Sequence, residues 1–361
     1  MDAEPLPALY AKWTSEFLGP IPRESRATCD DCAMCARPGS EDEPETEYFN
    51  PSTKCCTFLP DIPNFLVGAA LKDSDPAGAA GRESLNARIA RKEGVTPMGL
   101  GPTAVYDSLF KEAPEAFGKS LEMLCPHFLS ESSSCGIWRH REATCATWFC
   151  KHVRGAVGYE FWNKRLHELL TAIEFDLAKS VTLELLADSN ALTALVETGA
   201  WKLEADAITL EAIERRADPK SYARIWGPWA GREEAWFIQC SEIVDPLSFA
   251  DVCARCGPNI QAHLRLTKVS YQRLVSPPAP SRVRPVSLRV LNAGPESTRV
   301  GTYNGYDPLD IPNAVLQQLY AFRGRSVDEA VQDIQVRTGM RFEESLVRKL
   351  IDFEVLEEES P

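Results

Sequence analysis

Cysteine is the residue type whose number and spacing in this chain could support chemistry. The sequence has 12 cysteines, and nine of them fall between residues 29 and 150. The first three, Cys29, Cys32 and Cys35, are separated by two residues each. Such gaps let a turn aim successive thiolates at one centre, which is typical of three ligands of an iron–sulfur cluster. The bacterial ferredoxin pattern would place the next cysteine at Gly39, so a further ligand must come from elsewhere.

The other cysteines of this region are the candidates for further ligands. They are Cys55, Cys56, Cys125, Cys135, Cys145 and Cys150. Nine thiols suffice for two four-ligand sites, so we expect one or two 4Fe–4S clusters, with zinc as the alternative. Mixed Cys/His zinc sites are also open, because three histidines lie within five residues of a cysteine: His127, His140 and His152.

Basic side chains flank several of these cysteines. They are Lys54, Arg139, Arg141 and Lys151. Their charge would stabilise thiolates and lower thiol pKa values, although loop residues of this kind are often plain solvated surface.

A third group consists of Cys240 and the CxxC pair Cys253 and Cys256. This group could bind metal, form a redox pair or consist of ordinary buried cysteines. A redox motif would follow a strand in a βαβ pattern, and the sequence around it shows no such pattern.

Composition and charge indicate the cellular compartment and the classes of partner to expect for this protein. The first residues are acidic where a secretory signal would be basic, and no stretch approaches the ~20 apolar residues of a membrane span. We therefore expect a cytoplasmic protein without a membrane partner, in which thiols stay reduced unless they bind metal or act in catalysis. The net charge of −13, with the basic residues scattered, argues against nucleic acid as a partner.

The helices and strands that the sequence predicts around the cysteines indicate an α+β fold. Residues 1–160 are expected to form a loop-rich cysteine-cluster domain, with a short helix within residues 1–24. No long helix is expected between residues 57 and 124, because Pro and Gly interrupt the apolar segments there. The SESSS segment between Cys125 and Cys135 predicts the turn of a hairpin.

Residues 161–275 are predicted to be a helical segment packed on the cysteine domain. Apolar residues recur at helical spacing, and those expected to point inward are Leu166, Leu169, Leu170, Ile173, Leu177, Leu183, Leu185 and Leu186. A further helix is expected over residues 233–244. The Pro-rich stretch of residues 276–285 indicates a linker and a domain boundary.

Residues 286–358 are predicted to form a small winged-helix-like domain. A strand over residues 286–291 would pair with residues 298–303. One helix is expected to begin at Pro312, a second to be capped by Ser326 and Glu329 and to end at Gly339, and a third to run from about Glu343.

The string LCPHF, followed by CGIW, HR, TC and WFCK, carries a family resemblance. It resembles the second half of the CxxCxxCC family of YkgJ-like zinc- or iron-chelating proteins, which includes relatives of flagellin lysine N-methylase. The matching residues are Cys125, Cys135, Ile137, Trp138, Arg141, Cys145 and Cys150. The family's opening run ends in a Cys-Cys pair, whereas here Ala36 follows Cys35 and the pair comes only at Cys55 and Cys56. Over residues 29–155 the resemblance implies metal chelation, with iron–sulfur favoured.

Residues 310–356 resemble PqqD-like winged-helix modules, which bind leader peptides in peptide-modification pathways. This resemblance implies a peptide or protein partner for the C-terminal domain. We therefore expect a metal-binding protein that acts as an accessory or modifying factor on a peptide. The alternatives are a structural zinc-binding interaction protein and a lysine N-methylase-like enzyme. No GxSxG, Walker A or HExxH string occurs, so the sequence identifies no catalytic residue and leaves open whether the chain is an enzyme.

Overall fold

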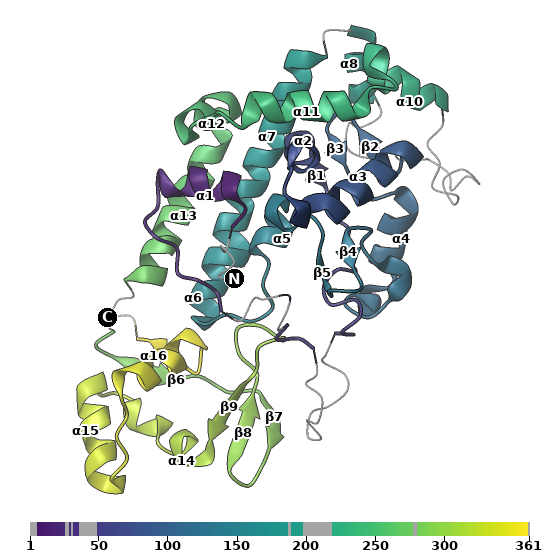
Figure 1. The fold of residues 1–361 in the computed structure, drawn as a ribbon. Coiled ribbons are helices and arrows are strands. Elements are labelled where there is room, and N and C mark those ends of the chain that lie inside the picture. The colour runs from purple at the N-terminus through teal and green to yellow at the C-terminus, as the bar shows by residue number, and fades with distance from the viewer. Residues whose placement is uncertain are drawn as a thin grey trace. The chain divides into compact units, whose positions relative to one another are not determined.

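The computed structural model describes residues 6–25, 29, 32–35, 49–186, 189–197, 219–276 and 280–359. Within these residues the fold is mixed α+β, mostly helical with small antiparallel sheets, as Figure 1 shows. No helix of the described residues is both long enough and apolar enough to span a bilayer.

The chain divides into two compact units that are interleaved along the sequence. The first unit comprises the described residues of Met1–Pro20, Thr28–Trp148 and Leu166–Arg265. The second comprises those of Ile21–Ala27, Phe149–Arg165 and Leu266–Pro361. The predicted cysteine region therefore falls almost entirely in the first unit, and most of the predicted winged-helix-like region falls in the second.

The first unit is built mainly from helices. They are α1 (Ala8–Ser15), α2 (Asn64–Lys72), α3 (Ala79–Arg91), α4 (Ala104–Glu112), α5 (Ala143–Thr147), α7 (His167–Leu185), α8 (Ser189–Glu197), α10 (Pro219–Trp226), α11 (Glu233–Val244) and α12 (Phe249–Cys256). Short 3-10 turns connect them: η1 (Pro76–Gly78), η2 (Pro114–Ala116), η3 (Leu121–Met123), η4 (Trp138–His140) and η6 (Gly227–Trp229). Its strands β1 (Ile62–Pro63), β2 (Val95–Thr96) and β3 (Gly99–Leu100) form a sheet in the order β1-β3-β2, and β4 (Phe128–Leu129) pairs with β5 (Ser134–Cys135).

Among the described helices of this unit, α2 and α11 make the most extensive contact, and they lie together in Figure 1. A Cβ atom at Gly68 would overlap the backbone carbonyl of Phe237, so only glycine permits this approach. Phe65 and Trp236 are fully buried beside the contact. The Trp236 indole also donates to the Pro97 carbonyl at 2.9 Å, so its polar atom is satisfied inside the core.

Several sequence predictions for this unit are confirmed. Helix α11 has the expected bounds, the hairpin β4–β5 flanks the SESSS turn, and α1 lies within residues 1–24. The apolar residues expected to point inward between Leu166 and Leu186 are buried, except that Leu185 is half-buried and Leu183 is 53% exposed. Residues 198–218 of the predicted helical segment lie outside the described residues.

The expectation that residues 57–124 contain no long helix is wrong for α3, which has 13 residues. Its sequence, AAGRESLNARIAR, lacks Pro and contains strong helix formers. Pro76 lies in the preceding turn η1, where it can begin a helical segment without breaking one. The Pro and Gly residues therefore separate helices here instead of preventing them.

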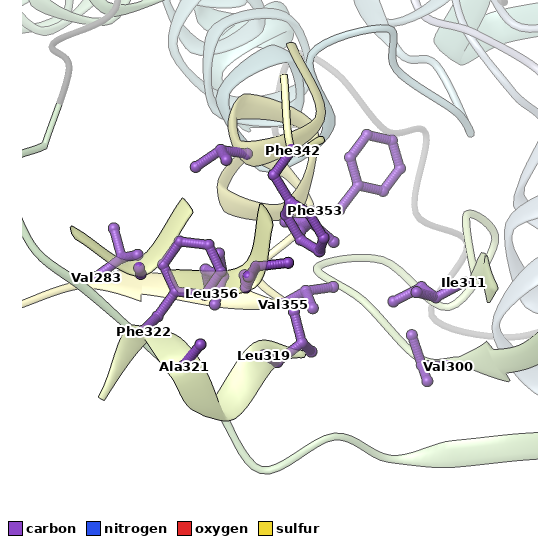
Figure 2. Close-up of a cluster of buried hydrophobic side chains, with 14 residues drawn as sticks. Val283, Val300, Ile311, Leu319, Ala321, Phe322, Phe342, Phe353, Val355 and Leu356 are labelled. Carbon is purple, nitrogen blue, oxygen red and sulfur yellow. The ribbon is translucent and has the colours of Figure 1, made fainter. Parts of the chain in front are cut away.

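The second unit contains two small sheets and several short helices. Its helical elements are α6 (Gly155–Tyr159), η5 (Glu160–Leu166, which ends in the first unit), the C-terminal part of α13 (Asn259–Val275), α14 (Asn313–Leu316), η7 (Leu319–Phe322), α15 (Val327–Thr338) and α16 (Glu344–Asp352). Strands β7 (Val290–Ala293), β8 (Ser297–Val300) and β9 (Leu309–Pro312) form an antiparallel sheet, and β6 (Val283–Pro285) pairs with β10 (Leu356–Glu358). Figure 2 shows the apolar core beneath them, which includes Phe322, Phe353 and Val355.

Local signals predicted the helices α15 and α16 well. Ser326 and Glu329 form the expected capping box, and Gly339 ends α15 in the left-handed conformation. Three features differ from the prediction. The strand expected from residue 286 begins at Val290, and residues 283–285 of the expected linker form β6. Residues 309–312 form strand β9 instead of leading into a long helix, because they pair with β8 along its whole length.

Candidate metal centre

The turn before the Cys55–Cys56 pair ties the first cysteines to the β4–β5 hairpin. Lys54 adopts a left-handed backbone conformation, with φ of 50°, and is buried. Its ammonium group donates hydrogen bonds to the carbonyl of Cys29 and, at 2.6 Å, to that of Ser133 in the hairpin turn. A buried lysine thus connects three segments that are distant in sequence and brings a positive charge among the thiols.

A second tether joins the cysteine pair to Cys125. The backbone N–H of Cys125 donates to the carbonyl of Cys56 at 2.7 Å. The Tyr106 hydroxyl holds the following residues, because it donates to the Thr57 carbonyl and accepts from the Leu59 N–H at 2.7 Å. A backbone hydrogen bond therefore places Cys56 beside Cys125, and the Tyr106 side chain holds the residues that follow.

Backbone N–H groups donate to two of the sulfur atoms. The N–H of His127 donates to the sulfur of Cys125, and the N–H of Ile137 donates to that of Cys135. Burial outweighs these bonds and raises the pKa of Cys125 to about 11 and that of Cys135 to about 12. In both cases the donor is the N–H of the residue two positions after the cysteine. Such a donor stabilises a thiolate, and hydrogen bonds to sulfur also tune the properties of iron–sulfur clusters.

Cys145 lies at the start of α5 beside two buried carboxyl groups. Glu142 caps this helix and accepts from the N–H groups of Thr144 and Cys145 at 2.5 and 2.7 Å. Burial, followed by the charge of Glu142, raises the pKa of the Cys145 thiol well above its usual value. Glu174 of α7 accepts from the Ala143 N–H at 2.9 Å and from the Tyr10 hydroxyl, and burial raises its pKa as well.

Eight of the nine predicted cysteines lie close enough to influence each other electrostatically. Burial, followed by the charge of Cys55, raises the pKa of Cys29 to about 12, and burial, followed by the charge of Cys32, raises that of Cys35 to about 12. A hydrogen bond to the Cys55 side chain, then burial and the charges of Cys55, Cys135 and Cys125, raise the pKa of Cys56. The full set is Cys29, Cys32, Cys35, Cys55, Cys56, Cys125, Cys135 and Cys145. Together they form what we call the thiol cluster, and all of it belongs to the first unit.

Arg141 lies inside the thiol cluster. It is only 5% exposed, and its guanidinium carbon stacks 3.3 Å from the centre of the Trp138 ring. Its Nε has no hydrogen-bond partner among the described residues. Burial lowers the pKa of Arg141, and the nearby thiols, first Cys135 and then Cys29, act in the opposite direction. The thiol cluster therefore contains a buried cation, and its positive charge would stabilise nearby thiolates.

Arg88 supplies a second buried cation, and sequence reasoning missed it. It is 1% exposed, donates to the Gly101 carbonyl at 2.6 Å and acts on the thiol of Cys125. Burial lowers the pKa of Arg88 to about 10. The available signal was its position on the buried stripe of α3, seven residues after Gly81 and three after Leu85.

His127 is held by hydrogen bonds on both ring nitrogens. Arg88 can only donate, so its contact of 3.3 Å makes Nε2 of His127 an acceptor. The Nδ1–H then donates to the Ser84 hydroxyl at 2.8 Å, and Ser84 in turn donates to the Gly81 carbonyl at 2.8 Å. This arrangement favours a neutral, non-ligating histidine, with a pKa that burial and Arg88 lower to about 3.

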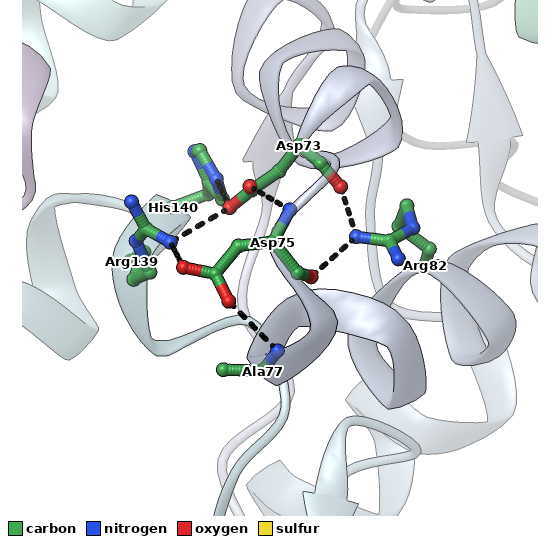
Figure 3. Close-up of polar contacts among 6 residues, drawn as sticks. All are labelled: Asp73, Asp75, Ala77, Arg82, Arg139 and His140. Atoms are coloured by element: carbon green, nitrogen blue, oxygen red, sulfur yellow. Dashed lines mark hydrogen bonds and ion pairs between the residues drawn. The ribbon is translucent and has the colours of Figure 1, made fainter.

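His140 and Arg139 belong to a separate polar group, shown in Figure 3. His140 Nε2 lies 2.9 Å from the Asp73 carboxylate, and Arg139 contacts the Asp75 carboxylate at 2.5 Å. Arg139 is also 55% exposed on its side chain. These pairs, with Arg82 donating to the carbonyls of Asp73 and Asp75, fasten the segment after Cys135 to the start of α3.

The remaining cysteines are located outside the thiol cluster. Cys150, with Lys151 and His152, belongs to the second unit, where the Asn304 side chain donates to the Cys150 carbonyl at 3.0 Å. Cys240 is fully buried in α11. In α12, burial, followed by the charges of Asp176 and Cys253, raises the pKa of Cys256 to about 12. Cys240 and Cys256 are buried as core thiols of helices, whereas Cys150 and Cys253 are half-buried.

The donor set fits a metal centre in its chemistry. Eight thiols, two N–H···S hydrogen bonds and three buried cations, Lys54, Arg88 and Arg141, are what thiolate ligands require. No three Cys, His, Asp or Glu side chains of the described residues are arranged to hold one ion, so the structure assigns no coordination geometry.

The described fold and site define a mixed α+β protein with a mostly half-buried cluster of free thiols and buried cations beside them. Comparisons with protein-family models, with curated proteins and with solved structures found no match for the chain.

Proposed function

We propose that the first unit binds metal through the thiol cluster, as one or two iron–sulfur clusters or, alternatively, as zinc. The observation that carries this proposal is Arg141, a buried guanidinium whose Nε is unpartnered among the described residues and which lies among thiols. A buried cation is costly unless negative charge compensates it. Thiolates bound to metal carry that charge at neutral pH, whereas thiols with a pKa of about 11 to 12 do not.

Metal content tests this function directly. The full-length protein is purified without oxygen, and iron, acid-labile sulfide and zinc are measured together with the visible absorption spectrum. Iron and sulfide in similar amounts, with a brown colour, would support iron–sulfur clusters, and colourless protein with zinc would support the structural alternative. Protein that takes up neither iron with sulfide nor zinc would refute the proposal.

A matched pair of variants tests the role of Arg141. Arg141→Met removes the buried charge and keeps most of the volume, so we expect metal content to fall strongly. Arg139→Met removes a neighbouring guanidinium that is 55% exposed and paired with Asp75, so metal content should stay near the wild-type level. Equal retention by both variants would show that compensation by Arg141 does not support metal binding.

We further propose that the second unit holds a peptide on which the metal-bearing unit acts as an accessory or modifying factor. The support is strand β7, which lies at an edge of its sheet and exposes all four of its residues. A peptide could extend the sheet there through main-chain hydrogen bonds. We include in this proposal that the region is winged-helix-like and resembles PqqD-like modules. A lysine N-methylase-like activity is supported only by the family resemblance.

Leu291 offers a precise test of this edge. The pairing of β7 with β8 shifts between Val290 and Asn292, so Leu291 lies in a bulge outside the ladder. Leu291→Pro removes a backbone donor with little damage to the hairpin, whereas Leu291→Ala keeps the donor. On an array of synthetic peptides with alternating apolar residues, binding should be lost with Pro and kept with Ala. Unchanged binding with Pro would rule out Leu291 as a required donor.

A further inference from the structure

The edge strand β7 carries an inference that deepens, and rests on, the proposed peptide binding of the second unit. We propose that the peptide held there is an extended segment in which apolar and acidic side chains alternate. Its apolar side chains lie on the face of the sheet that meets the core, and its acidic side chains lie on the opposite face. The chemistry of the two faces at this edge selects this pattern.

Strand β7 leaves one side open for pairing. Among the described strands only β8 pairs with it, so its other side is the edge of the sheet. All four of its residues are exposed, and two of them are large apolar residues, Val290 and Leu291. Natural edges are protected by Lys, Pro or bulges, and β7 has the bulge at Leu291 but neither Lys nor Pro. The edge therefore remains able to pair with another extended segment.

On one face of the sheet, which we call the inner face, an apolar row runs from the core to the edge. Residues paired across strands share a face, and Val300 is paired with Leu309 on β9 and with Val290 on β7. Val300 is fully buried in the core, whereas Val290 at the end of the row is 57% exposed. An apolar peptide side chain beside Val290 would cover this exposed surface and extend the core by one strand.

The opposite face, which we call the outer face, is polar at this edge. Arg299 is paired with Asp310 on β9 and with Asn292 on β7. Side chains alternate between faces along β8, so this row lies on the other face from Val300. The Arg299 guanidinium donates to both carboxylate oxygens of Asp310 at 3.0 Å. The edge member of the row, Asn292, has an amide that can donate to an acidic side chain.

Arg289 adds a positive charge to the outer face at the same edge. Its carbonyl accepts the Gly301 N–H at 2.8 Å, so the two residues lie side by side at the start of β7. A Cβ atom on Gly301 would lie 3.7 Å from Cβ and Cδ of Arg289, which places the Arg289 side chain on the same face as Gly301. Gly301 follows Arg299 by two residues and therefore shares its face. Arg289 is exposed and forms no ion pair within the described part of the chain.

Each face therefore favours one kind of peptide side chain. Opposite charges on neighbouring strands stabilise pairing and like charges oppose it, so an acidic side chain is favoured between Arg289 and Asn292. Side chains of an extended peptide alternate between the faces, so its apolar residues then meet the inner face. The net charge of −13 would by itself favour basic peptides, so a preference for acidic ones must come from this edge.

Binding of short synthetic peptides to the full-length protein tests the pattern. Three fluorescein-labelled peptides are followed by fluorescence anisotropy: alternating Val and Glu, alternating Val and Lys, and alternating Ser and Glu. The Val/Glu peptide should bind, and each of the other two should bind more weakly by about tenfold. Equal or tighter binding of the Val/Lys or the Ser/Glu peptide would overturn the proposal.

Charge reversal locates the preference on the protein. Arg289→Glu should lower the preference for the Val/Glu over the Val/Lys peptide by about tenfold. Arg341→Glu, at an exposed arginine between α15 and α16, makes the same change of charge outside the sheet and should keep the wild-type preference. Val290→Thr should weaken binding of the Val/Glu peptide by about threefold and leave the charge preference as it is. Unchanged preference in Arg289→Glu, or an equal shift in Arg341→Glu, would overturn the assignment to this edge.

Failure of this inference is distinguishable from failure of the proposed function. A wild-type protein that binds other peptides of the array described for Leu291, but not the Val/Glu peptide, would refute the alternation and leave peptide binding in place. A protein that binds no peptide at all would refute peptide binding itself. A dimer in sedimentation equilibrium that Leu291→Pro dissociates would show that a second copy of the chain occupies β7, and would also overturn the inference.

Discussion

Acid should destabilise this protein through one buried histidine. His127 is fully buried, and burial together with Arg88 lowers its pKa from 6.5 to about 3. Below pH 6.5 the unfolded chain takes up a proton that the folded protein excludes, so the free energy of unfolding decreases as the pH falls from 6.5 towards 3. A shift of this size corresponds to at most about 5 kcal/mol, of which about 2 kcal/mol is lost by pH 5.

The variant His127→Gln cannot take up this proton. At pH 7 it should be less stable by about 1 to 3 kcal/mol, because the hydrogen bonds to Arg88 and Ser84 are weakened. Its loss of stability between pH 7 and 5 should be smaller than that of the wild type by about 2 kcal/mol. Urea unfolding followed by tryptophan fluorescence measures both quantities, and His263→Gln, at a side chain 37% exposed, is the control. The same acid slope in His127→Gln and in the wild type would refute the reasoning.

Three further predictions concern the thiols and the packing of the first unit. Burial, followed by the charge of Cys125, raises the pKa of Cys135 to about 12, so the Cys135 thiol keeps its proton to a higher pH in the folded state than in the unfolded state. After the metal is stripped, the free energy of unfolding should therefore fall as the pH rises above about 9. Urea unfolding at pH 8 and pH 10 measures this fall. Burial raises the pKa of Asp73, but hydrogen bonds from His140 and the Asp75 N–H outweigh burial and lower that pKa overall. Asp73→Asn should therefore lower the free energy of unfolding by about 1 to 2 kcal/mol at pH 7 and change it little below pH 3. Gly68→Ala should lower the free energy of unfolding by about 3 kcal/mol, because its Cβ would overlap the Phe237 carbonyl; a thermal shift below 2 °C would contradict this contact.

Features encoded by neighbouring residues could be predicted from the sequence. Helix α11 follows from its apolar spacing, and α15 from the capping box at Ser326 and Glu329 and the glycine at Gly339. Strand β9 could not be predicted in this way, because residues 309–312 are extended only through their pairing with β8.

The candidate site shows the same limit. The cysteines stand out by type and spacing, and eight of the nine between residues 29 and 150 lie in one unit. Arg88 was missed because its role depends on contacts with Gly101 and His127, which are distant along the chain. Helical spacing from Gly81 and Leu85 separates Arg88 from exposed Arg91 on the same helix, but it does not show which groups Arg88 contacts. Arg139 was a candidate for charge compensation, but its partner is Asp75.

The interleaved chain course has a consequence for how the cysteine region reaches its folded state. Residues 28–148 enter and leave through two segments of the second unit, and these segments are joined where Glu24 accepts the Val153 N–H at 2.7 Å. The second unit thus acts on the cysteine region as a cross-link would, closing a loop of roughly 120 residues, whose closure costs about 4 kcal/mol of chain entropy. If the second unit forms first, the thiols search for metal within a closed loop and not along a free chain.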